Sequence, residues 1–155
     1  MKLVFTLVAL TLLPFGVSAL DAKTMCEQLQ PVVSQLRTQL PQDVDYMTKL
    51  TGVQALFVSG NCLLNYNYVV SSAHLLQEMA AENQQSDDEN LAFLQTEQGV
   101  SSMKSVFSSL ATNAATTHFA AFSAIPGVKI TYSHSFDHSQ LKPVVSVVMD
   151  TTLGQ

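Results

Sequence analysis

Apolar and polar residues follow two different periods along the chain, and each period predicts one kind of element. In residues 22–40 the apolar side chains recur at steps of three and four, which is the stripe of an amphipathic helix. Pro31 lies inside this segment and predicts a kink or a restart near Gln30, because proline removes a helical hydrogen bond. Pro41 ends the predicted helix.

Strands are predicted where apolar and polar residues alternate with a period of two. Residues 64–70 and 128–136 alternate in this way, and residues 144–149 form a short apolar run typical of a further strand. Residues 46–58 fit both periods, so we expect a strand only over residues 56–58, before a turn at Gly60 and Asn61. The predicted sheet therefore draws on both halves of the chain.

The segment between residues 71 and 127 is predicted to be helical. Residues 71–72 can cap a first helix, and Ser86 and Glu89 have the spacing of a capping box for a second. We expect Gly99 to end that second helix and a longer one to begin near residues 101–102. Helices and strands mix without a regular βαβ order, which predicts an α+β fold, a single small domain with an antiparallel sheet packed against helices.

The first residues have the organisation of a secretory signal peptide. Lys2 supplies a positive charge, residues 3–13 are apolar, and residues 17–19 are small. A membrane anchor is the alternative, but the apolar run is short against the roughly 20 residues that cross a bilayer. We expect a signal peptide over residues 1–19, cleavage near Ala19, and a domain over residues 20–155 in the periplasm or outside the cell.

Two cysteines, Cys26 and Cys62, follow the predicted cleavage point. A single pair in an exported chain predicts one disulfide, and two buried free thiols are the alternative. A bridge over this loop would stabilise the domain by roughly 4 kcal/mol in the chain-entropy model.

Composition and charge exclude several classes of protein. The chain is 47% apolar and 12% charged, which is typical of a packed domain rather than a disordered segment. Six basic and twelve acidic residues lie after position 19, so the exported part carries a net charge of −6. This charge disfavours nucleic acid and anionic membrane surfaces as partners.

The candidate chemistry is concentrated in one late segment. His134, Phe136 and His138 would share a face if the strand continued that far, and Asp137 lies between the last two. Two imidazoles so far apart on a strand cannot share a metal ion unless a turn folds them together. We therefore assign no catalytic residue, no metal ligand and no cofactor, and we expect a protein that is not an enzyme.

Four aromatic side chains are the candidate interface residues. Tyr66, Tyr68, Tyr132 and Phe136 lie on two predicted strands, and as an interface they would supply rigid anchors. A place in the half-buried core is the alternative.

Three short patterns make the chain resemble small exported proteins of Gram-negative bacteria. They are Leu40-Pro41-x-x-Val44-Asp45-x-x-Thr48-x-Leu50, Asn65-Tyr66-Asn67-Tyr68 and Gly127-Val128-x-Ile130-x-Tyr132. The resemblance implies an exported α+β domain of the kind found among toxin-neutralising immunity proteins, secretion accessories and secreted effectors. It carries over no catalytic residues.

These observations favour an exported protein-binding domain whose partner is another exported protein. An immunity protein that neutralises a secreted toxin is the leading form of this hypothesis. Its alternatives are an accessory of a secretion apparatus or a small effector that the apparatus releases. A metal protein or enzyme using His134, Asp137 and His138 is a third class, and a homodimer stays open.

Overall fold

The computed structural model describes residues 21–152, so the predicted signal peptide and cleavage point lie outside the described residues. The helices are α1 (Ala22–Arg37), α2 (Ser72–Asn83), α3 (Asp87–Leu94) and α4 (Glu97–His118), with a 3₁₀ turn at Ala120–Ala124. The strands are β1 (Gln42–Asp43), β2 (Thr48–Val58), β3 (Asn61–Val70), β4 (Val128–Phe136) and β5 (Val144–Asp150). The α+β class is as predicted. Among the described residues, no helix is both long and apolar enough to cross a membrane.

The strands form one sheet in the order β1-β2-β3-β4-β5. Neighbouring strands are antiparallel except β3 and β4, which run parallel. The sheet is therefore mixed, which corrects the expectation of an antiparallel sheet. The parallel pair is possible because the chain passes through α2, α3 and α4 between β3 and β4. Two parallel neighbours need such a crossover of a dozen or more residues.

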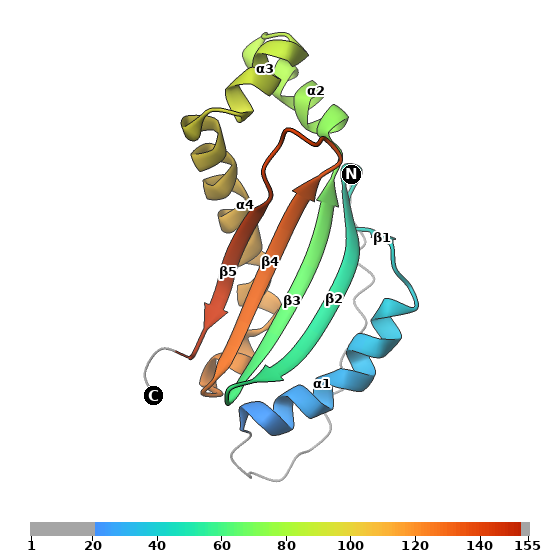
Figure 1. The fold of residues 1–155 in the computed structure, drawn as a ribbon, viewed down its shortest axis with the longest axis vertical. Coiled ribbons are helices and arrows are strands. Elements are labelled where there is room, and N and C mark those ends of the chain that lie inside the picture. Colours follow the sequence, from blue (N-terminus) through green and yellow to red (C-terminus); the bar gives the residue numbers. More distant parts are fainter. Residues whose placement is uncertain (1–20, 153–155) are drawn as a thin grey trace.

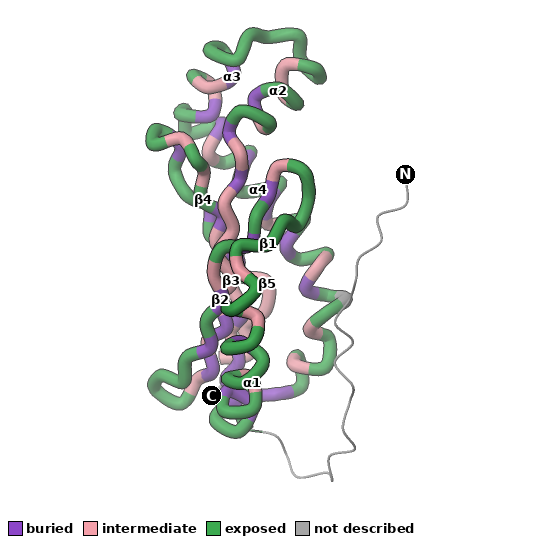
Figure 2. Tube along the Cα trace, turned by 90° about the vertical axis from the view of Figure 1, so that its right-hand side faces the viewer, coloured by how far each residue is buried: buried purple, intermediate pink, exposed green. Residues whose placement is uncertain are grey.

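Helices α1 and α4 cover the same face of the sheet, called here the covered face (Figures 1 and 2). Cys26 of α1 is bonded to Cys62 of β3, and Phe107 of α4 contacts His134 of β4. Both strand residues belong to the even-numbered set that alternation places on one side. The opposite face, called here the open face, has no helix of the described chain over it, and α2 and α3 project beyond one end of the sheet (Figure 1).

The disulfide lies inside the main hydrophobic core. Cys26 and Cys62 are 1% and 0% exposed, and their Cα atoms are 5.4 Å apart. The core around them is made of apolar side chains from α1, α4, β2, β3 and β4, among them Met25, Val53 and Ile130. The predicted bridge is therefore present, and it fastens α1 to the start of β3, the central strand of the sheet.

The structure corrects two predicted boundaries. Residues 48–58 form one strand, where only its end was expected, because a β-bulge between Leu50 and Gly52 interrupts the alternation. Burial then falls on Leu50 and next on Val53, a step of three that imitates a helix. Helix α4 begins at Glu97 and runs through Gly99, which was expected to end a helix. The capping box of Ser86 and Glu89 is confirmed.

Candidate functional site

Four rings form a continuous ladder across β3 and β4 on the covered face. The ring centroids of Tyr66 and Tyr132 are 5.4 Å apart, and those of Tyr132 and Tyr68 are also 5.4 Å apart. Tyr68 stacks on His134 with centroids 5.0 Å apart and ring planes 14° apart. The parallel register sets Tyr66 beside Tyr132 and Tyr68 beside His134, so the two strand patterns place these rings together. We call these four residues the aromatic ladder.

The structure places all the candidate interface residues on this side of the sheet. Tyr132 is buried, and Tyr66, Tyr68 and Phe136 are partly buried. Burial raises the pKa of Tyr132 to about 12 and raises the pKa values of Tyr66 and Tyr68 as well. The phenol groups therefore stay neutral over the physiological range. Their interface role stays a prediction.

His134 is held between two aromatic rings without a hydrogen bond to its Nδ1 atom. Tyr68 stacks on one side, and the ring of Phe107 from α4 lies 4.6 Å away between centroids. The residue is 8% exposed, and Nδ1 has no partner in the described structure. Burial without a compensating charge lowers the pKa of His134 to about 4. His134 is therefore neutral at pH 7.

This burial predicts acid sensitivity. The unfolded chain binds a proton at His134 near pH 6.5, whereas the folded chain binds it only near pH 4, so stability falls as the pH drops through this window. Preferential protonation of His134 in the unfolded chain should lower the free energy of unfolding by about 3 kcal/mol between pH 7 and pH 4. The variant His134→Phe keeps a flat ring and should lack this loss. Urea unfolding of both proteins at the two pH values measures it, and an equal pH dependence would contradict the prediction.

A narrow groove opens between the aromatic ladder and α4. Its volume is about 190 Å³, and its floor includes Tyr68, Tyr132 and His134. Its other walls come from α4 and from the start of β2 with the residues before it, and comprise Phe107, Leu110, Ala111, Ala114, Val44, Asp45 and Thr48. The carboxylate of Asp45 already stabilises the turn before β2, because its Oδ1 accepts hydrogen bonds from the backbone N–H groups of Met47 and Thr48. The groove therefore offers apolar contact and a neutral imidazole, which suits binding of a small apolar group.

The late histidine segment does not form a common site. Strand β4 ends at Phe136, and Asp137 turns back to α2, where its Oδ1 accepts hydrogen bonds from Ser72 N at 2.6 Å and Ser72 Oγ at 2.5 Å. These bonds lower the pKa of Asp137 and cap α2 from a distant part of the chain. His138 accepts a hydrogen bond from Gln140 N. Within residues 21–152, no three His, Cys, Asp or Glu side chains are placed to hold a metal ion.

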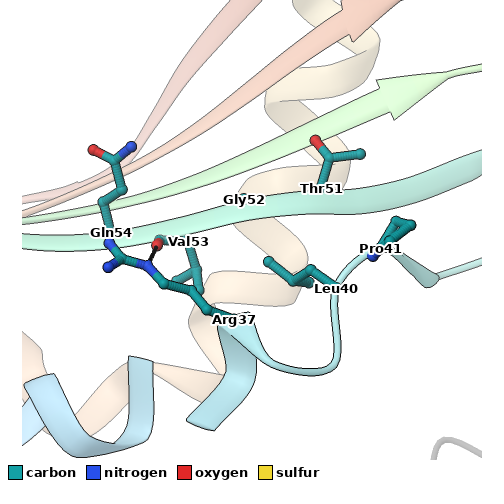
Figure 3. A pocket seen from close by; sticks show the side chains of 7 residues that line it. All are labelled: Arg37, Leu40, Pro41, Thr51, Gly52, Val53 and Gln54. Atoms are coloured by element: carbon teal, nitrogen blue, oxygen red, sulfur yellow. Dashed lines mark hydrogen bonds between the residues drawn. The ribbon is translucent and has the colours of Figure 1, made fainter. Parts of the chain in front are cut away.

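A second depression lies at the outer edge of β2, beside the end of α1 (Figure 3). It has a volume of about 390 Å³, and its lining includes Arg37, Thr51, Gly52 and Gln54. Arg37 Nε donates to the carbonyl oxygen of Val53 at 2.8 Å (Figure 3), and Gln30 Nε2 donates to that of Ala55 at 2.7 Å. Side chains of α1 therefore satisfy two carbonyl groups of this strand, those of Val53 and Ala55.

The acidic residues are not spread evenly over the fold. Residues 71–103, which comprise α2, α3 and the start of α4 and are called here the acidic hairpin, contain no Lys or Arg. They contain Glu78, Glu82, Asp87, Asp88, Glu89 and Glu97. The rest of residues 20–155 has six acidic and six basic residues, so the whole net charge of −6 belongs to the hairpin. The sequence contains this signal, but only the fold shows that the charged segment projects from the sheet (Figure 1).

Comparison with known proteins adds one structural likeness. No protein-family model matches the chain, and no curated protein matches it. The crystal structure of a "putative secreted protein" from Pseudomonas aeruginosa is similar to it with 15% sequence identity and a TM-score of 0.46. The likeness covers 85% of this chain and 95% of that chain. A likeness of this extent carries no conclusion about function.

Proposed function

We propose that the chain is an exported protein-binding domain that engages a basic protein through its acidic hairpin. The observation that carries the proposal is the separation of charge. The projecting hairpin has a net charge of −6, whereas the remainder of residues 20–155 has a net charge of zero. A surface of one sign that stands away from a neutral body steers a partner of the opposite sign to one place.

Two features support export. Residues 1–19 have the organisation of a signal peptide, and the domain contains a buried disulfide in its core. Structural disulfides form and persist in oxidising compartments and are rare in the cytosol. The periplasm and the extracellular medium both meet this condition.

The finer form of the proposal is an immunity protein that neutralises a secreted toxin. Toxins that cleave or bind nucleic acid or membranes carry basic surfaces, and an acidic projection could cover such a surface by complementary charge. The alternative is an accessory of a secretion apparatus or a small effector that the apparatus releases. The identity of the bound protein separates these forms.

The test captures partners with three forms of residues 20–155. Glu82→Lys reverses a charge on the hairpin, and the new lysine can pair with Glu78 four residues earlier, so α2 should stay folded. Glu27→Lys makes the same change of charge on an exposed position of α1 and is the matched control. It also removes the exposed ion pair with Lys23, so circular dichroism checks that both variants are folded. Each form is cross-linked to its partners in periplasmic extract and in culture supernatant of the source organism. Mass spectrometry identifies the bound proteins, and titration of each one against the three forms measures its affinity.

The proposal predicts a basic protein that binds the wild type and Glu27→Lys equally. Glu82→Lys should bind it several-fold more weakly at low salt, and the difference should shrink as salt screens the charges. Equal binding to all three forms, or no stoichiometric partner in either fraction, would contradict it. A toxin whose activity is blocked would favour immunity, and a component of a secretion apparatus would favour the alternative.

A further inference from the structure

One buried side-chain atom of the described chain has no hydrogen-bond partner, and it belongs to a residue of the groove beside the aromatic ladder. Among residues 21–152, this atom is Nδ1 of His134. Nε2 of the same ring has no hydrogen bond within these residues either, and burial is the cause of its low pKa. Buried polar side chains without a partner are rare in folded proteins, because such a group gives up its bonds to water without replacement. The imidazole is therefore available to a molecule from outside.

Two aromatic rings fix the orientation of this imidazole. The ring of Tyr68 stacks on it with planes 14° apart, and the ring of Phe107 lies 4.6 Å away between centroids. A bound molecule therefore meets the edge of the imidazole rather than its faces. Because Nδ1 is buried, Nε2 is the ring nitrogen of His134 that such a molecule can reach. In the neutral ring Nε2 either donates or accepts a hydrogen bond, and no bond at Nδ1 decides which.

The size of the groove limits the bound molecule to about one ring. Its volume is about 190 Å³, and an apolar cavity of about 150 Å³ holds benzene. Tyr68 and Tyr132 supply aromatic rings to its floor. Leu110 and Val44 line the groove and are 59% and 37% exposed, so apolar side chains lead from solvent into it. Ligand sites commonly combine such apolar walls with a small number of polar groups.

The charge of the lining favours an uncharged molecule. Asp45 is the one lining residue that is charged at pH 7, and its carboxylate repels anions. Its Oδ1 atom already accepts two backbone hydrogen bonds. The other lining residues are apolar or neutral, and His134 and Thr48 are the polar ones among them on the sheet side of the groove.

We propose that the groove binds a small uncharged aromatic molecule with one hydroxyl group, which is the chemistry of a phenol. The ring of this molecule lies against Tyr68 and Tyr132, and its hydroxyl group forms a hydrogen bond with Nε2 of His134. A hydroxyl group both donates and accepts, so it suits either tautomer of the neutral imidazole. The bound molecule thereby gives the imidazole the partner that the fold does not supply.

The test titrates residues 20–155 at pH 7 with phenol and with benzene, which lacks the hydroxyl group, and follows the backbone amide signals by NMR. His134→Phe keeps a flat ring beside Tyr68 and Phe107 but removes Nε2. Ala114→Leu places a larger side chain in the wall of the groove. His138→Phe makes the first exchange at a position that does not line the groove and is the matched control. Circular dichroism checks that each variant is folded.

Phenol should shift the signals of the groove residues in a saturable way. It should bind roughly fivefold more tightly than benzene, because its hydroxyl group adds one hydrogen bond. His134→Phe should lose this preference, folded Ala114→Leu should bind neither probe, and His138→Phe should match the wild type.

Three results would overturn the inference. The first is the absence of saturable shifts, or shifts confined to residues outside the groove. The second is equal affinity for phenol and benzene, or a preference for phenol that His134→Phe retains. The third is tighter binding of benzylammonium than of phenol, which would assign the site to the carboxylate of Asp45. The groove shares no residue with the acidic hairpin, so phenol binding and capture of a basic protein can succeed or fail separately.

Discussion

Loss of the Cys26–Cys62 disulfide is expected to lower the unfolding free energy of the domain by roughly 4 kcal/mol. The two residues are 36 positions apart, and the bridge restricts the unfolded chain over that loop. Both sulfur atoms lie in the core, so Cys26→Ser also places a hydroxyl group where Cys26 is 1% exposed. A typical domain is stable by only 5–15 kcal/mol, so about 4 kcal/mol is a large share. The melting temperature of oxidised wild type and Cys26→Ser measures the loss.

Reduction of the wild type provides the control for this prediction. Dithiothreitol should lower the melting temperature of the wild type and leave Cys26→Ser unchanged, because the variant has no bridge to reduce. The same melting temperature for oxidised wild type and Cys26→Ser, with two thiols titrated in the unreduced wild type, would remove the bridge from the explanation of stability.

The variant Gly99→Ala is expected to destabilise the domain by roughly 3 kcal/mol, although alanine normally favours a helix over glycine. Gly99 lies in the first turn of α4, where its backbone N–H donates to Thr96 Oγ1. A Cβ atom there would collide with the backbone of Phe93 and Leu94 at the end of α3. These are main-chain atoms, so the junction of the two helices would have to move. Urea denaturation gives the difference in free energy.

Gly52→Ala is the matched control for the collision. A Cβ atom at Gly52 would meet Asn67 Nδ2 at 2.9 Å and Asn67 Cβ at 3.3 Å, so only side-chain atoms are in the way. We expect a loss of about 1 kcal/mol, because the Asn67 amide can turn aside at the cost of the hydrogen bond that its Oδ1 accepts from Asn65 Nδ2. If Gly99→Ala were as stable as the wild type, the close packing of α3 on α4 would be contradicted.

The strands with regular alternation could be predicted from the sequence. Residues 128–134 bury every second side chain, and in residues 64–70 the side chains of the same set are buried at both ends and half-buried between them, so the period is visible without any tertiary contact. The capping box at Ser86 is local in the same way, since both of its bonds lie within one turn. The cysteine pair could be predicted because export leaves few other uses for two cysteines.

The other boundaries depend on contacts that the sequence does not display. The bulge in β2 shifts the buried phase between Leu50 and Val53, so the strand imitates helical spacing. A glycine such as Gly99 is typical of a helix end. Here it lies inside a helix, because the backbone of α3 approaches too closely for a Cβ atom. The parallel pairing of β3 and β4 follows from the path of the three helices between them.

The sequence predicts which residues lie at the candidate site better than it predicts what those residues do. The strand pattern places Tyr132 and His134 on the buried side, but the ring of Phe107 that completes the surroundings of His134 comes from a helix far along the chain. The sequence groups Asp137 with the two histidines, whereas the structure shows that its carboxylate caps α2 through Ser72, 65 positions away. Such long-range hydrogen bonds leave no periodic signal.

The central claim is that the domain works outside the cytoplasm with its disulfide formed. The most direct test is the intact mass of the protein after the full chain, with residues 1–19 included, is expressed in a Gram-negative host. Periplasm, medium and cytoplasm are separated, and each fraction is treated with iodoacetamide before the mass is measured. We predict residues 20–155 in the periplasm or the medium, with Cys26 and Cys62 bonded and unmodified. Uncleaved chain in the cytoplasm with both cysteines alkylated would contradict the claim.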